Sequence, residues 1–224
     1  MSSTTNQLIS QYIGRLRAEG AAGIEQYEQK LRANAGNPDV LTDLLLEARA
    51  ALMFLRNGFE GAMRERPDLQ IEFDKEVVYV EVKHFRQKEQ DRVDEKAMLE
   101  AHDRLVLTGE LLESEGAVAW EQIVDVAIGK ASQYMSDAPN ILVVESSSPS
   151  LELMLETAIR QYDKEVLESY DLRLRRLSGM MLVQTDWIAI REPRNVDFCP
   201  TAHAAAPLRG RVASALAAIR IDLP

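Results

Sequence analysis

Hydrophobic residues recur at helical spacing through the first third of the chain. Two polar, helix-forming segments, about Thr5 to Glu19 and Ala22 to Ala33, carry weak apolar faces, and a stronger face follows Pro38 and continues to Gly58. Proline at the start and glycine past the end are typical helix boundaries. We therefore expect a helical extension over residues 1–37, followed by the first helix of the main domain. The apolar positions expected on the three helices are Leu8, Tyr12 and Leu16; Ile24, Tyr27 and Leu31; and Val40, Leu44, Ala48, Ala51 and Leu55.

After Pro67, the spacing of hydrophobic residues changes from a helical period to a period of two residues, which is typical of a strand. Apolar and polar residues alternate from Leu69 to Phe73, and Val77 to Lys83 is rich in β-branched residues. These two segments are typical of a hairpin. A two-residue turn at Lys75 and Glu76 places every apolar residue of one strand opposite an apolar residue of the other. A three-residue loop would break that match.

The hairpin also brings acidic residues and one amine to a common face. With the turn at 75–76, Gln70 opposes Glu81 and Asp68 opposes Lys83, because successive side chains of a strand point to opposite faces. Asp68 then lies diagonal to Glu81, about 7 Å away between Cα atoms. The alternative is that Asp68 is only a turn residue after proline, and that Glu81 and Lys83 belong to a solvated strand face.

The remaining chain alternates between helical and extended patterns. A highly charged segment, residues 86–116, is expected to form one irregular helix and a surface loop. The elements expected after it are a helix at Ala117 to Met135, a strand at Ile141 to Ser146, a helix near Leu151 to Glu168 and a strand within Met180 to Ile190. This order predicts an α/β fold in which helices flank a mixed sheet. The domain would span residues 38–224, with a core at about 40–146 and additions at 147–224.

Composition narrows the classes of function. The 224 residues are 46% hydrophobic and 28% charged, typical of a globular protein, and a net charge of −10 disfavours a polybasic protein that binds nucleic acid regardless of sequence. A single cysteine, Cys199, permits no internal disulfide, and with three histidines it excludes a Cys/His zinc module. The chain shows no signal-peptide pattern, and no stretch approaches the roughly 20 apolar residues of a membrane span. We expect a cytoplasmic protein with no membrane partner.

Asp68 and Glu81 are candidate ligands of a hard cation. Two carboxylates at this separation can share Mg²⁺, which prefers oxygen ligands and keeps several waters, and the backbone carbonyl of Val82 would be a further ligand. Lys83 beside them could orient or deprotonate the attacking water, or offset charge on an attacked phosphate. This combination indicates metal-assisted hydrolysis of phosphodiesters.

A third carboxylate and two polar side chains lie on apolar helix faces. Glu47 falls among the apolar positions of its helix, where an unpaired carboxylate costs several kcal/mol. It therefore needs a cation or a donor, which is either a metal site or an arginine partner such as Arg49 or Arg56. Lys130 and Gln133 lie three residues apart on the inner face of the later helix, from which they could reach the same site or a phosphate.

The segment RPDLQIEFDKEVVYVEVK resembles the PD-(D/E)XK nuclease superfamily, which has the restriction-endonuclease-like fold. The matching residues are Pro67 and Asp68 for the PD pair, Glu81, Val82 and Lys83 for the ExK triplet, Glu47 for the acid on the preceding helix, and Gln133 for the polar residue on the following helix. The resemblance covers about Val40 to Ser146 and implies an αβββαβ core with its first strand near Phe59 to Glu65. It further implies a metal-dependent nuclease but does not supply the substrate. We expect an endonuclease that hydrolyses DNA with Mg²⁺ or Mn²⁺, in restriction, defence or repair. The metal ligands would be Asp68, Glu81 and the Val82 carbonyl, with Glu47 as a further candidate.

Basic side chains are weaker candidates for substrate binding. Lys130 could contact a phosphate, and Arg173, Arg175 and Arg176 form the run RLRRL, which is either an edge for the DNA backbone or a solvated face. Cutting both strands of a duplex would suit a homodimer. Two other functions stay open. One is a nuclease-like fold that has lost catalysis and serves as a binding or assembly module; the other is an acidic interaction protein whose hairpin charges are all solvated.

Overall fold

Six strands form one mixed sheet, in which spatial neighbours follow the chain order β1-β2-β3-β4-β5-β6. The computed structural model describes residues 3–85, 119–146, 155–184 and 196–220. The strands are β1 (Glu60–Met63), β2 (Leu69–Phe73), β3 (Glu76–Phe85), β4 (Asn140–Ser146), β5 (Leu177–Gln184) and β6 (Val196–Pro200). The helices are α1 (Ser3–Ala18), α2 (Ile24–Ala33), α3 (Pro38–Arg56), α5 (Ala119–Gly129), α6 (Leu155–Glu168) and α7 (Gly210–Ala217), with a 3₁₀ helix, η3 (Leu172–Arg176). The helix expected within 86–116 lies outside the described residues.

The sheet combines an antiparallel half with a parallel centre. β1, β2 and β3 form an antiparallel meander, β3, β4 and β5 run parallel, and β6 returns antiparallel to β5. Helix α5 precedes β4 and helix α6 precedes β5, as parallel neighbours require a crossover. The expected α/β fold with a mixed sheet is therefore confirmed, and β1 lies within the segment where the first strand was expected. The sequence patterns do not predict β6 or α7.

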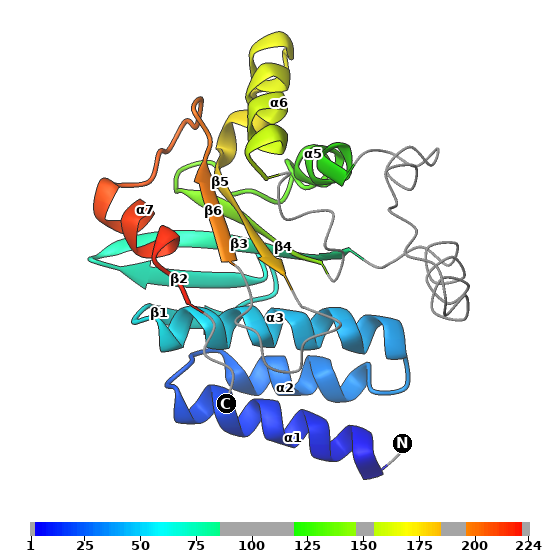
Figure 1. Cartoon of the computed structure of the whole chain (residues 1–224). Helices are drawn as coiled ribbons and strands as arrows, with labels where there is room; N and C mark the ends of the chain where they lie inside the picture. The colour runs from blue at the N-terminus through cyan, green and yellow to red at the C-terminus, as the bar shows by residue number, and fades with distance from the viewer. Residues whose placement is uncertain (1–2, 86–118, 147–154, 185–195, 221–224) are drawn as a thin grey trace, which may run out of the picture.

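Helices cover both faces of the sheet. Figure 1 shows α1, α2 and α3 stacked against one face, with α5 and α6 on the other. The apolar residues Val78, Val80 and Val82 of β3 belong to the core shared with α1, α2 and α3, so the two N-terminal helices pack into the main core. A second core joins β4 and β5 to α5 and α6. Within the described ranges, no helix combines the length and apolar character needed to cross a membrane.

The inner face of α1 differs from the expected one. Ile9, Ile13 and Leu16 are buried, whereas Leu8 is 37% exposed. The buried residues follow an i, i+4, i+7 stripe, which shares only Leu16 with the expected set. The three expected apolar residues of α2 are buried. In α3, the expected position Val40 is exposed near the start of the helix.

The turn between β2 and β3 is formed by Asp74 and Lys75. Both have positive φ angles, 51° and 64°, as a type I′ hairpin turn requires. The turn expected at 75–76 was wrong by one residue, and the register is therefore shifted by two, with Leu69 opposite Val80. The expected register pairs all three apolar residues of β2 with valines, whereas the observed register leaves Phe73 opposite Glu76, so the apolar pattern alone favours the wrong register. Glu76 distinguishes them, because its carboxylate is buried against the start of α7 and is not part of the turn.

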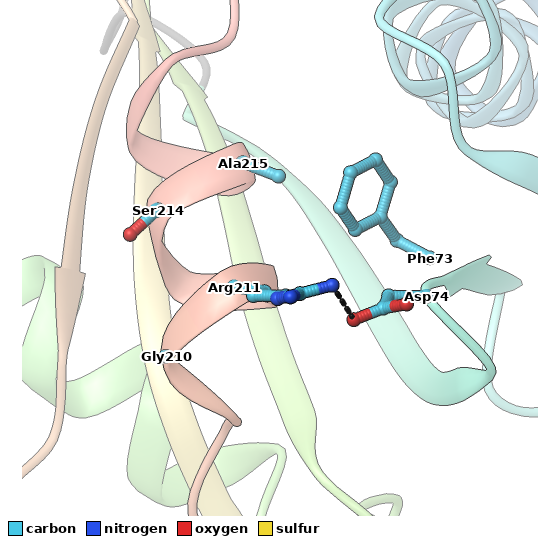
Figure 2. A pocket seen from close by; sticks show the side chains of 6 residues that line it. All are labelled: Phe73, Asp74, Gly210, Arg211, Ser214 and Ala215. Carbon is cyan, nitrogen blue, oxygen red and sulfur yellow. Dashed lines mark hydrogen bonds and ion pairs between the residues drawn. The ribbon is translucent and has the colours of Figure 1, made fainter.

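Helix α7 packs against the tip of this hairpin. The Arg209 backbone N–H donates to the Glu76 carboxylate at 3.2 Å, and Arg211 Nη1 lies 3.3 Å from Asp74 Oδ2. Figure 2 shows the shallow hollow between the helix and the hairpin. Its lining residues are Phe73, Asp74, Gly210, Arg211, Ser214 and Ala215. None of the candidate site residues lines this hollow.

Candidate functional site

The pairing of β2 with β3 fixes Asp68 beside the peptide of Val82. The Val82 backbone N–H donates to Asp68 Oδ2 at 2.8 Å. Continuing the observed register places Asp68 directly opposite Glu81, and not diagonal to it as the expected register implied. The next step places Pro67 opposite Val82. Proline has no N–H, so Pro67 cannot fill the ladder position that faces the Val82 carbonyl, the backbone oxygen expected to bind a cation.

Glu81 is a buried carboxylate that pairs with the amine of Lys130, a residue just past the end of α5. Its side chain is 2% exposed, and Lys130 Nζ donates to Glu81 Oε2 at 2.8 Å. Lys130 also donates to Gln133 Oε1 at 2.9 Å. Burial foremost, and then the charge of Asp68, raises the pKa of Glu81, while Lys130 opposes the rise. The two polar residues expected on the later helix therefore lie just past the end of α5, where Lys130 contacts Glu81 and Gln133 contacts Lys130.

Glu47 is also buried, on the inner side of α3. Lys30 Nζ of α2 donates to both carboxylate oxygens of Glu47, at 3.2 and 3.4 Å. Burial foremost, and then the charge of Asp68, raises the pKa of Glu47 to about 7, and Lys30 opposes this rise. The partner of Glu47 is thus a lysine of the N-terminal extension.

The two arginines considered as partners of Glu47 serve other acids. Arg49 Nη2 contacts both oxygens of Glu145, at 2.6 and 2.7 Å, and Glu145 is buried near the end of β4. Arg56 Nε lies 3.0 Å from Glu19 Oε1. The expectation of an arginine partner was therefore wrong, although the expectation that Glu47 needs a charged partner was sound.

The charge of Asp68 influences both of the other candidate acids. The charge of Asp68 raises the pKa of both Glu47 and Glu81, and the charge of Lys130 lowers both. Asp68 comes from the start of β2, Glu81 from the middle of β3, and Glu47 from α3. Glu47 and Glu81 both lie within the electrostatic influence of Asp68, and Lys130 links Glu81 to Gln133.

Lys83 lies two positions beyond Glu81 on the same face of β3 and is half-buried. In the part of the chain that the structure describes, no ion pair joins Lys83 to Glu81, whereas Lys130 makes one. The amine that contacts Glu81 therefore belongs to Lys130, in the segment after α5. Lys83, the amine of the expected ExK triplet, lies further along β3.

The arginines of the RLRRL run lie apart from the acids. Arg173 Nη2 pairs with Asp171 at 2.7 Å, and Arg175 is exposed. Arg176 Nη1 donates to the backbone carbonyl of Tyr134 at 3.2 Å, next in sequence to Gln133. Only Arg176 therefore approaches the segment that carries Lys130 and Gln133.

Sequence reasoning missed two basic residues of the site, Lys30 and Arg66. Lys30 lies beside the buried stripe of α2, next to Leu31, but the segment was interpreted only as an added helical layer. Arg66 directly precedes the proline–aspartate pair, and its charge lowers the pKa of Glu81. The sequence signal that could have identified them is their position next to residues that already stood out. Lys30 adjoins the core residue Leu31, and Arg66 adjoins Pro67.

The candidate donors are oxygen atoms, the type of ligand that a hard divalent cation prefers. Within the described residues, no group of three or more His, Cys, Asp or Glu side chains is arranged to hold a metal. The oxygen donors that could contact a cation here are the carboxylates of Asp68 and Glu81 and the Val82 carbonyl. Mg²⁺ is commonly held by one or two carboxylates while it keeps several waters, and Mn²⁺ accepts similar oxygen ligands.

The arrangement combines acids that can hold a cation with amines that can meet a negatively charged substrate. Asp68 and Glu81 are fixed by hydrogen bonds to Val82 and Lys130, which limits their freedom before any ligand binds. Such preorganised groups suit chemistry in which negative charge develops on an oxygen. No family model, curated protein or solved structure matches this chain.

Proposed function

We propose that this protein is a metal-dependent endonuclease with a restriction-endonuclease-like core, and that it hydrolyses phosphodiester bonds of DNA. The observation that carries the proposal is the placement of two acids on adjoining strands: Asp68 is hydrogen-bonded to the Val82 peptide, and the neighbouring Glu81 is buried against the amine of Lys130. Carboxylates and amines in one place are the groups that phosphodiester hydrolysis needs.

The order of elements supports the proposal. Helix α3 is followed by β1, β2, β3, α5 and β4, which is the αβββαβ order that the sequence resemblance implies. The candidate residues occupy corresponding places in that order. Asp68 precedes β2, Glu81 and Lys83 lie on β3, and Gln133 follows α5.

Each residue has a role in the proposed reaction. Asp68, Glu81 and the Val82 carbonyl hold Mg²⁺ or Mn²⁺, and Glu47 supports them from α3. The cation supplies Lewis-acid stabilisation of the phosphate when it is bound. Lys83 lies further along the strand, toward the attacking water, and Gln133 positions the ammonium group of Lys130.

The substrate and cellular setting are part of the same proposal. DNA is the proposed substrate, and a homodimer would allow both strands of a duplex to be cut. The single cysteine, Cys199, is consistent with a cytoplasmic location. Arg176 is the member of the basic run placed best for a contact with the DNA backbone, because it adjoins the Gln133 segment.

A catalytically inactive binding or assembly module is the second candidate. The observation that favours it is that each acid already has a partner within the chain: Asp68 the Val82 N–H, Glu81 the Lys130 amine and Glu47 the Lys30 amine. Acids neutralised in this way stabilise a fold without binding a cation. This candidate predicts normal folding with neither cation binding nor cleavage.

Cleavage of supercoiled plasmid DNA distinguishes the two candidates. The endonuclease predicts nicking or linearisation with Mg²⁺ or Mn²⁺, abolished by EDTA and reduced at least about a hundredfold in Glu81→Gln. Glu168→Gln, which alters an exposed pair on α6, is the matched control and should cleave normally. Cleavage that survives both EDTA and Glu81→Gln would exclude the proposed site. Wild-type protein that binds no cation and cuts nothing would support the binding module.

A further inference from the structure

Lys130 makes the most constrained ionic contact of the site. Its ammonium group donates to Glu81 Oε2 at 2.8 Å and to Gln133 Oε1 at 2.9 Å. The Glu81 side chain is 2% exposed and that of Lys130 is 23% exposed. The pair therefore lies mostly away from water, where a charge interaction is stronger than at the surface.

A divalent cation at Glu81 and the ammonium group of Lys130 would compete for the same carboxylate. Two positive charges within a few ångströms repel each other, and the buried carboxylate cannot satisfy both as well as one. The Lys130 backbone is held separately, since its N–H donates to the Val126 carbonyl at 2.9 Å. Its flexible four-carbon side chain can therefore move its charge without a change in the backbone.

Lys83 does not share this geometry. It lies on the same strand face as Glu81, yet no ion pair joins the two in the described part of the chain. If competition depends on direct contact, only one of these two lysines should set the affinity of the site for a cation. The contrast provides an internal comparison between two amines of one site.

We propose that Lys130 is a built-in competitor for the divalent cation at Glu81, so that cation binding requires its ammonium group to leave that carboxylate. This inference rests on the cation site of the proposed function. It adds that the Lys130 ammonium group lowers the affinity of that site for a divalent cation. Occupancy of the site then depends on the concentration of the divalent cation. Gln133 keeps the ammonium group in place through the second hydrogen bond.

The test is a titration of the full chain with Mn²⁺, followed by electron paramagnetic resonance of the free ion. Lys130→Met should bind Mn²⁺ about tenfold or more tightly than the wild type, because the competing charge is gone. Lys164→Met removes a lysine from an exposed pair with Glu168 and should leave the affinity unchanged. Lys83→Met should change the affinity much less than Lys130→Met. Circular dichroism checks folding, and Lys130→Gln replaces the methionine variant if that one unfolds.

Each result decides the inference. Tighter binding confined to the Lys130 variant supports it. Equal or weaker binding in that variant overturns it, as does an equal gain in Lys83→Met, which would indicate a general field effect. The absence of Mn²⁺ binding in every variant also overturns it. Failure of the proposed nuclease function would appear separately, as intact plasmid DNA in the presence of a cation that binds with the expected dependence on Lys130.

Discussion

The Val82 backbone N–H donates to the carboxylate of Asp68 at 2.8 Å, where the continued strand register places Pro67 opposite Val82. The Val82 N–H therefore meets a side-chain carboxylate, while Pro67, which has no N–H, cannot donate to the Val82 carbonyl. The same contact fixes the carboxylate next to Glu81. A hydrogen bond that extends the pairing of β2 with β3 therefore also restrains a carboxylate of the candidate site.

Substitutions at Asp68 should separate these two roles. Asp68→Asn keeps an oxygen for the Val82 N–H and removes the charge that raises the pKa of Glu47 and Glu81, so it should be at least as stable as the wild type. Asp68→Ala leaves a buried N–H without this acceptor and should be about 1–2 kcal/mol less stable than Asp68→Asn. Urea unfolding at pH 8 measures the difference.

Both Asp68 variants should lose Mn²⁺ binding, whatever their stability. Equal stability of the two variants would show that the Val82 hydrogen bond contributes little to folding. Retained Mn²⁺ affinity in Asp68→Asn would remove Asp68 from the ligand set. Glu168→Gln, on exposed α6, is the control for a change of one acidic charge.

The sequence predicts much of the fold because its strongest patterns are local. Helices α2 and α3 and strand β4 appear where helical spacing, boundary residues and apolar runs place them. The hairpin turn was misplaced because the apolar pattern favours a register that pairs Phe73 with Val78, whereas the structure pairs Phe73 with Glu76. The observed register depends on Glu76, whose carboxylate accepts a hydrogen bond from the Arg209 N–H at the start of α7, 133 residues later in the chain. Local patterns carry no information about such a contact.

The candidate site was predictable in its residue types but not in its pairings. Asp68, Glu81 and Gln133 stand out from spacing and resemblance, and the structure links Gln133 to Glu81 through Lys130 and fixes Asp68 at the Val82 peptide. The amine bound to Glu81 was expected from Lys83, two residues away, but comes from Lys130, at a separation of 49 residues. Ion pairs between distant segments depend on how helices pack on the sheet, and alternation along one strand does not reveal them.

The stability of the protein should fall between about pH 4.5 and 7 because of Glu47. Burial and the charge of Asp68 raise the pKa of Glu47 from 4.5 to about 7, so the folded state binds a proton more tightly than the unfolded chain. This contribution is fully present below pH 4.5 and is lost as the pH rises through 7. Its size is at most about 3 kcal/mol, at 1.36 kcal/mol for each pKa unit. Urea unfolding at half-unit pH steps measures the slope.

Glu47→Gln supplies the comparison for this slope. The variant cannot ionise at this position, so its stability should decline less than that of the wild type across the same pH window. Glu168→Gln removes an exposed carboxylate and should keep the wild-type slope. If Glu47→Gln and the wild type show parallel curves, the titration belongs to another group.

The buried pair between Arg49 and Glu145 should contribute strongly to stability. Arg49 Nη2 contacts both Glu145 oxygens, and the carboxylate side chain is 3% exposed. Arg49→Met removes this positive charge from a buried acid and should cost about 2–3 kcal/mol, less than a fully buried pair because Arg49 is partly exposed. The double variant Arg49→Met/Glu145→Gln should recover much of that loss. Guanidinium unfolding of the single and double variants tests the coupling, and strictly additive losses would contradict it.

Gly23 should be essential for seating the N-terminal helices, and with them Lys30, on the sheet. Its φ is +73°, and a Cβ at this position would collide with the Met63 carbonyl oxygen. The adjoining Ala22 is tied to the edge strand by hydrogen bonds of 2.9 Å to the backbones of Gly61 and Met63. Gly23→Ala should therefore cost about 2 kcal/mol or more, from the strained backbone and the displaced contact.

Gly36→Ala is the matched control, because no atom lies within 4 Å of its added Cβ and its φ is not in the left-handed region. Its effect should stay within about 0.5 kcal/mol. Thermal unfolding ranks the two variants. Because α2 begins directly after Gly23 and carries Lys30, Gly23→Ala should also weaken the contact of Lys30 with Glu47. The carboxyl carbon resonance of Glu47, followed by NMR against pH, should then titrate at a higher pH, since Lys30 is the group of α2 that favours its ionised form. An unchanged titration in a destabilised Gly23→Ala would show that α2 keeps its position without this turn.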